Sequence, residues 1–147
     1  MIGSHLGASC WHRVDKHRLD LFSRAIHDRT NEPTAVPSSP VAPDANHGLL
    51  LLSMAAGLSL EALDFTGVDL ALNRGINRAR FRAGIPLNSW VRMTITLSSV
   101  RDRPMRMIEV ISALAFEVRG DPDPICTAES IAILRRSASS DARLARS

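Results

Sequence analysis

The fold of this chain is decided by residues 46–60, whose sequence is NHGLLLLSMAAGLSL. Beyond its polar start, a helix made of this stretch is apolar on nearly every side, so it is stable only where other protein covers it. The apolar run ends before Glu61 and Asp64, well short of the roughly 20 residues that cross a membrane. We therefore predict a core helix wrapped by a sheet, and no contact with a membrane.

The composition fits one globular domain with a core of its own, because the chain has 147 residues and 45% of them are hydrophobic. The 18 Lys and Arg outnumber the 15 Asp and Glu, and the net charge is +3. Lys16 is the single lysine, and arginine suits phosphate and carboxylate groups. Aromatic residues make up only 4%. Nucleic acid is not expected as a partner, since binding it usually needs stacking aromatic side chains.

Cys10 and Cys126 match neither a metal-ligand spacing nor a disulfide framework, which favours reduced thiols in a cytoplasmic protein without a metal site. The first residues lack the basic and apolar segments of a signal peptide. We predict that residues 1–14 are an extension outside the domain, either disordered or left over from cloning.

A single domain is predicted over residues 15–135. Asp15 can cap an amphipathic helix that ends near Asp28. Residues 31–46 contain four prolines and are predicted to form a long loop. Loops of this length in compact domains usually serve a site. Residues 136–147 are small and polar, and we expect them to form a tail.

Four strand-like runs follow the core helix, at residues 69–81, 91–98, 105–119 and 125–134. The second run alternates apolar and polar residues, which is typical of a half-buried strand. Helices followed by strands with short turns indicate an α+β fold whose strands form an antiparallel meander. One sheet on one helix leaves an edge strand open, so a homodimer is expected.

Three motifs resemble those of the MaoC-like acyl dehydratases, which include the (R)-specific enoyl-CoA hydratases. They are His47-Gly48-Leu49-Leu50, Asn77-Arg78-Ala79-Arg80-Phe81 and Ile85-Pro86-Leu87-Asn88-Ser89-Trp90-Val91. The resemblance covers about residues 15–134 and implies the hot-dog fold, in which a sheet wraps a long helix, usually in a dimer. It also implies that the substrate is an α,β-unsaturated acyl thioester of coenzyme A or acyl carrier protein, and that water is added or removed without a resident cofactor.

The resemblance assigns a carbonyl donor to the start of the core helix. Negative charge builds on the thioester oxygen during the reaction, so the enzyme needs donors placed beforehand. The first N–H groups of a helix have no partner within it and carry partial positive charge. The backbone of Gly48 is therefore expected to donate to this oxygen, and a glycine lets the ligand come close.

The same resemblance assigns an acid/base pair to the segment before the helix. Asp28 stands where the family has its aspartate and is the expected base, although a surface carboxylate is an equal alternative. Five residues later the family has a histidine, whereas this chain has Pro33, which cannot carry a proton. Asn31 resembles the family asparagine, shifted by one position. His47 and His27 are further candidates for the missing proton carrier, and Glu32 is a further candidate base. His47 is expected as a cap or a hydrogen-bonding core residue more than as a proton carrier.

Arg78, Arg80 and Arg82 are candidates for the phosphates of coenzyme A, with solvated strand arginines as the alternative. Ser53 stands where carrier-protein dehydratases of the β-hydroxyacyl type have a glutamate. The helix has no carboxylate before Glu61, so that class and the hot-dog thioesterases are disfavoured. The competing hypothesis is a catalytically impaired hot-dog protein, which binds acyl thioesters without turnover or serves as a partner subunit.

Overall fold

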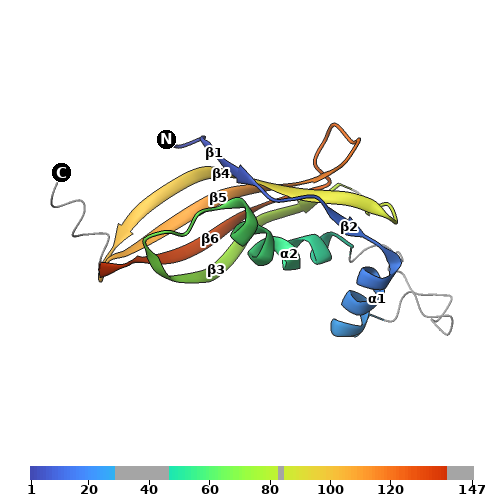
Figure 1. Ribbon diagram of the computed structural model, residues 1–147, viewed down its shortest axis with the longest axis horizontal. Helices are drawn as coiled ribbons and strands as arrows, with labels where there is room; N and C mark the ends of the chain where they lie inside the picture. The colour runs from blue at the N-terminus through green and yellow to red at the C-terminus, as the bar shows by residue number, and fades with distance from the viewer. Residues whose placement is uncertain (29–46, 83–84, 139–147) are drawn as a thin grey trace.

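The computed structural model describes residues 1–28, 47–82 and 85–138. Figure 1 shows a curved antiparallel sheet with helix α2 in its hollow and helix α1 beside the start of α2. The elements of these ranges are, in order, β1 (His5–Ala8), β2 (His12–Val14), α1 (Lys16–Ala25), α2 (His47–Ala62), β3 (Val68–Phe81), β4 (Ser89–Arg103), β5 (Met107–Val118) and β6 (Cys126–Arg136). The predicted α+β hot-dog fold is confirmed.

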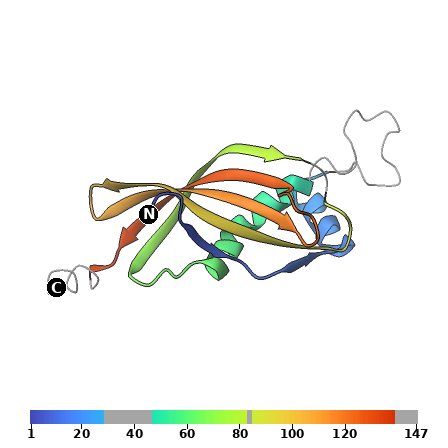
Figure 2. The same cartoon turned by 90° about the horizontal axis from the view of Figure 1, so that it is seen from above.

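The strand order in the sheet is β1-β4-β5-β6-β3, and β2 continues the β1 edge by pairing with β4. The prediction of a simple meander is therefore wrong for the first long strand. β3 does not pair with β4, its successor in sequence, but with β6, where Phe81 lies opposite Cys126. Because β3 crosses to the far edge, the two edges of the sheet, β3 and the β1–β2 segment, lie to either side of α2 (Figure 2).

The alternation in β4 sets the inner face of the sheet. Val91, Met93, Ile95 and Leu97 are buried, and the residues between them are half-buried. In β5 the even-numbered residues from Ser112 to Val118 are buried in the same way. Except for Leu97 and Ser112, these side chains join Leu51, Ala55 and Leu58 of α2 in the hydrophobic core, so the period of two read from the sequence is confirmed.

Helix α1 begins as predicted, because the Asp15 carboxylate accepts from the backbone N–H of Arg18 at 2.9 Å. The same hydrogen bond lowers the pKa of Asp15 below its usual value. None of the α1 residues is fully buried. Leu19 and Phe22 pack against the core from its edge.

The prediction that residues 1–14 lie outside the domain is wrong. His12 pairs with Val91, and Thr94 pairs with Ala8, so the N-terminal residues complete one edge of the sheet. Val14 is completely buried. These strands have only four and three residues, too few to show a period, and pairing with β4 alone specifies them.

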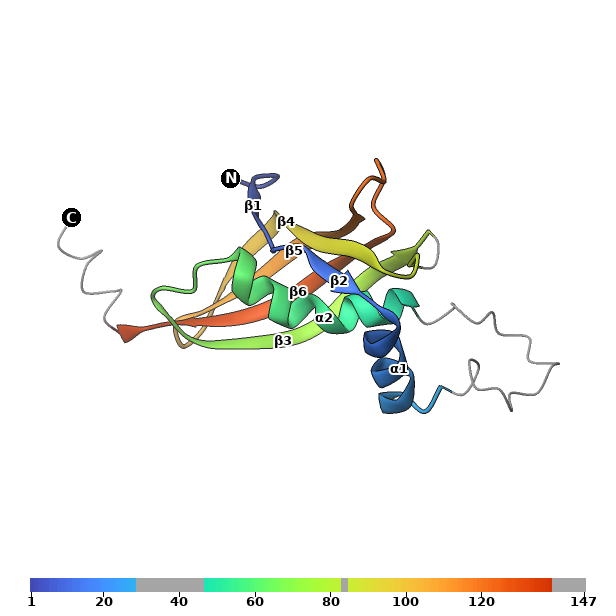
Figure 3. The same ribbon diagram turned by 45° about the vertical axis from the view of Figure 1, so that its right-hand side comes forward.

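The sheet covers only one side of α2, although the sequence predicts cover on every side. Leu51 and Leu58 are buried, whereas Leu60 is 71% exposed. Figure 3 shows α2 lying across the sheet, and the described residues leave most of its other side uncovered. An apolar helix with one open side needs a further partner, which a second chain can supply.

Neither helix in the described ranges is long and apolar enough to cross a membrane.

Candidate functional site

The start of α2 is packed directly against the end of β3. Gly48 is buried, and a methyl group on it would lie 2.0 Å from Cδ1 of Phe81. Two of the three sequence motifs therefore meet here, since Gly48 belongs to the first and Phe81 to the second. The missing side chain at Gly48 makes room for this ring, which is a structural use distinct from the ligand approach that we expected.

The first turn of α2 keeps the properties expected of a donor site. The helix begins at His47, so the N–H groups of its first turn have no carbonyl partner within the helix. Gly48 lies in this turn. The expected donation to a thioester carbonyl is compatible with this geometry and stays a prediction.

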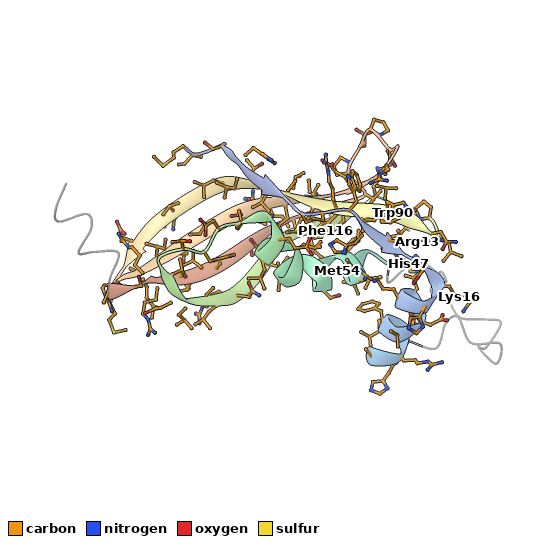
Figure 4. All side chains as sticks on the ribbon, in the orientation of Figure 1. Arg13, Lys16, His47, Met54, Trp90 and Phe116 are labelled. Atoms are coloured by element: carbon orange, nitrogen blue, oxygen red, sulfur yellow. The ribbon has the colours of Figure 1, made fainter. Side chains whose placement is uncertain are left out.

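His47 lies at the same end of the molecule as α1 (Figure 4). Its ring is half-buried, and its Nδ1 is buried without a hydrogen-bond partner among the residues that the structure describes. Buried nitrogens of this kind are usually paired. Within the described part of the chain, His47 thus brings an unpaired ring nitrogen to the start of α2.

Asp28 follows α1 in a left-handed turn. His27 has a φ of 56°, its N–H donates to the Arg24 carbonyl at 3.2 Å, and the Asp28 N–H donates to the Ser23 carbonyl at 2.8 Å. These two bonds form a Schellman cap, which fixes the backbone of Asp28 relative to α1. Helix α1, which Asp28 follows, contacts α2 (Figure 3).

The predicted role of Asp28 as a base stays a prediction. Asn31 and Pro33 lie outside the described residues.

The three candidate arginines lie in different surroundings. Arg78 is strongly exposed, has a φ of 50°, and its Nη1 lies 3.5 Å from Oε1 of Glu129. Arg80 is exposed at the neighbouring bulge of β3. Arg82 is tied to the turn after β5, where it forms an ion pair with Asp121 and donates to the Pro124 carbonyl at 3.3 Å.

The Arg82 bond lowers the pKa of Asp121 below its usual value. Arg82 is therefore occupied in holding this turn, while Arg78 and Arg80 are more open to an anionic ligand. Phosphate binding by any of the three stays a prediction.

A cavity of about 630 Å³ lies further along α2, between the helix and the inner face of the sheet. This volume falls within the range of small-molecule sites, about 300–1,000 Å³. Most of its walls are apolar, with small side chains on the helix side, including Ala56 and Gly57. Hydroxyl groups line it as well, from Ser53, Ser59, Ser112 and Ser130.

Solved structures share this architecture. A MaoC-like dehydratase from Rhodospirillum rubrum superposes with a TM-score of 0.66 over 93% of this chain and 94% of its own, at 9% sequence identity. At that identity the similarity shows the fold alone. No protein-family model matches the sequence.

Sequence relatives decide the family. The 3-hydroxyacyl-thioester dehydratase Z of Mycobacterium tuberculosis is 31% identical over 132 residues, which cover 88% of this chain and 87% of the relative. The chain belongs to the MaoC-like dehydratase family. Another relative of this MaoC-like chain is nodulation protein N of Rhizobium leguminosarum bv. viciae, which is 31% identical over 144 residues, 91% of this chain and 86% of the relative.

Two features of the MaoC-like site were missed by sequence reasoning. Phe81 was assigned no role. A glycine at the start of a buried helix leaves space for a neighbouring ring, and Phe81 fills that space. Ser112 was also missed, although it interrupts the apolar face of its strand between Val110 and Leu114. A polar residue at an inward position is the signal that could have found the cavity.

Proposed function

We propose that this chain is an acyl-thioester hydratase or dehydratase, which adds water to an α,β-unsaturated acyl thioester or removes it from a 3-hydroxyacyl thioester. The observation that carries the proposal is the near full-length relation to a protein named 3-hydroxyacyl-thioester dehydratase. The first turn of α2, whose N–H groups have no carbonyl partner within the helix, and a ligand-sized cavity further along the same helix are compatible with it.

Dehydration breaks a C–H bond at C2 and the C–O bond at C3, and the proton and hydroxyl leave as water. The carbanion-like charge formed at C2 spreads onto the thioester oxygen. We propose that the Gly48 N–H donates to this oxygen, because backbone donors fixed before the reaction cost no reorganisation. We assign the proton at C2 to Asp28, and the group that protonates the leaving hydroxyl is not assigned.

The acyl chain is proposed to extend from the start of α2 into the cavity beside the helix. The walls supplied by Leu52, Leu114 and Leu134 suit an apolar chain. Coenzyme A and acyl carrier protein are both compatible carriers of the thioester. The exposed Arg78 and Arg80 are proposed contacts for their phosphates. The chemistry requires no resident cofactor, and we propose a cytoplasmic location.

We propose that the protein is a homodimer joined along β3. This strand has 14 residues and ends the sheet order, so one of its edges is open in the described chain. Leu72 and Ile76 on β3 are exposed, as is Leu60 on α2. Long apolar edge strands normally pair or aggregate. Analytical ultracentrifugation is expected to give twice the chain mass, and a monomer at micromolar concentration would contradict the proposal.

One observation favours a second candidate, a non-catalytic acyl-thioester binder. Pro33 stands where the resembling family has its histidine, and a proline side chain cannot transfer a proton. The two candidates differ in turnover and not in binding.

Hydration of crotonyl-CoA, followed by the loss of enoyl absorbance, separates the candidates. We expect turnover by the wild type and a loss of about 100-fold or more for Asp28→Ala, as is usual when a general base is removed. Asp20→Ala is the matched control, because Asp20 is an exposed carboxylate on α1 paired with Lys16. Its rate is expected to equal that of the wild type.

Background rates for the wild type with crotonyl-CoA, a longer enoyl-CoA and a crotonylated carrier protein would contradict the enzyme proposal and favour the binder. Full activity in Asp28→Ala would contradict the role of Asp28 alone.

A further inference from the structure

Two serines lie side by side on the sheet wall of the cavity. Ser112 of β5 and Ser130 of β6 are directly opposite partners in the sheet, and both line the cavity under α2. Leu97 on β4 continues this row beyond Ser112, and Ile76 on β3 continues it beyond Ser130. The row is therefore polar in its middle and apolar at both ends.

The two hydroxyls have no hydrogen-bond partner among the residues that the structure describes. Ser112 is 6% exposed, yet neither its hydroxyl nor that of Ser130 forms a hydrogen bond with another residue in the described ranges. The serines on the helix side behave differently. Ser53 donates to the Leu50 carbonyl at 2.7 Å, and Ser59 donates to the Ala55 carbonyl at 2.8 Å. The hydroxyls of the sheet pair are therefore free to bond to a molecule that enters the cavity.

The need for a small side chain does not explain this pair. Ala128 and Ala132 occupy the neighbouring inward positions of β6, on either side of Ser130. Alanine at 112 and 130 would leave at least as much space. The hydroxyls are therefore features of the cavity in their own right.

We propose that Ser112 and Ser130 bind an oxygen carried along the acyl chain, so that the preferred substrate is an acyl thioester with a hydroxyl or keto group remote from the thioester. This rests on the proposed function for the identity of the ligand. The cavity walls on α2 include Ala56, which lies about 12 Å beyond Gly48 at about 1.5 Å per residue. The cavity thus extends well beyond the bonds that react, which leaves room for an oxygen remote from the thioester. A serine hydroxyl both donates and accepts, so it suits either a hydroxyl or a keto oxygen.

The test compares decanoyl-CoA with the 6-, 7-, 8-, 9- and 10-hydroxydecanoyl-CoA isomers, by isothermal titration with the full chain. These saturated thioesters cannot be hydrated, so their binding does not depend on turnover. We expect at least one isomer to bind about tenfold more tightly than decanoyl-CoA, the gain of one or two neutral hydrogen bonds. In the Ser112→Ala/Ser130→Ala variant this preference is expected to vanish, while the Kd of decanoyl-CoA stays the same or falls.

The matched control is Ser99→Ala, which removes a half-buried hydroxyl from a β4 position paired with Ile111, outside the cavity. This variant is expected to keep the preference. Equal binding of all the chains by the wild type, or a preference that survives the double substitution, would overturn the proposal. Failure of every acyl-CoA to bind would also overturn it, and is the result expected if a second copy of the chain fills the cavity.

The same compounds as trans-2-enoyl thioesters separate this inference from the proposed function. A preference in Kd without hydration of any of them would refute the hydratase and leave the recognition of the oxygen standing.

Discussion

The two ends of α2 both pack against the sheet through a glycine, but the glycine belongs to the helix at one end and to the sheet at the other. At the start, a glycine of the helix makes room for a side chain, the Phe81 ring. At the end, a glycine of the sheet makes room for the helix backbone, since a methyl group on Gly7 would lie 2.1 Å from the Ala62 carbonyl oxygen. A ring that is 45% exposed can turn aside, whereas a helix carbonyl cannot.

Polar contacts sharpen this contrast. At the end of α2, the Glu61 carboxylate accepts from the Cys10 N–H at 3.1 Å and lies 2.9 Å from Nε2 of His12. At the start, Nδ1 of His47 has no partner among the described residues. The end of α2 is therefore a fixed anchor, and the start keeps hydrogen-bonding groups that a substrate can use.

The largest expected effect on stability is that of Gly7→Ala. The new methyl group meets main-chain atoms that can move only with the helix, so we expect a loss of about 1–3 kcal/mol in the free energy of unfolding. Urea denaturation at one fixed protein concentration measures it. Gly57→Ala is the control, because its methyl group meets no described residue within 4 Å and alanine is the better helix former. Equal stability of Gly7→Ala and wild type would show that Gly7 does not pack tightly against the Ala62 carbonyl.

Gly48→Ala is expected to cost less, about 1 kcal/mol, because the Phe81 ring can rotate away. The double variant Gly48→Ala/Phe81→Ala removes the clash and tests the contact by a double-mutant cycle. We expect the two substitutions to be strongly non-additive in the free energy of unfolding. Additive losses would mean that the ring does not press on Gly48.

The smallest expected effect is that of Glu61→Gln, and it depends on pH. The His12 hydrogen bond holds the pKa of Glu61 below its ordinary value of 4.5, so the carboxylate stabilises the fold above that pH, and this stabilisation is lost as the pH falls through the lowered value. The stability difference between wild type and Glu61→Gln should therefore shrink below about pH 4.5.

Urea denaturation at several pH values tests this expectation, with Asp20→Asn on the surface of α1 as the control. A difference that grows toward low pH would contradict the assigned role of Glu61.

The same two ends show what the sequence could reveal. The start of α2 was predicted because an apolar run with a polar cap is a strong local signal, and the alternation in β4 gave the inner face of the sheet. The end of α2 was missed, because its partners are strands of three and four residues. These strands form because they pair with β4, which is distant in sequence, so no local pattern predicts them.

The candidate site divides in the same way. The sequence supplied Gly48 and His47 through the resemblance, and the structure places both at the start of α2. Their contact with Phe81 depends on β3 crossing to pair with β6, which short-range patterns do not predict. The Ser112–Ser130 pair depends likewise on the register between two strands.

Hydrogen exchange with and without butyryl-CoA tests most directly the claim that the start of α2 receives the thioester. This saturated thioester cannot be hydrated, and a carbonyl bound at the first turn should protect amides that have no acceptor within the helix. We predict slower exchange in residues 47–52 and around Phe81, and no change in residues 5–14 and 59–64. Protection confined to residues 5–14 and 59–64 would contradict the account, as would the absence of any protection at saturating ligand.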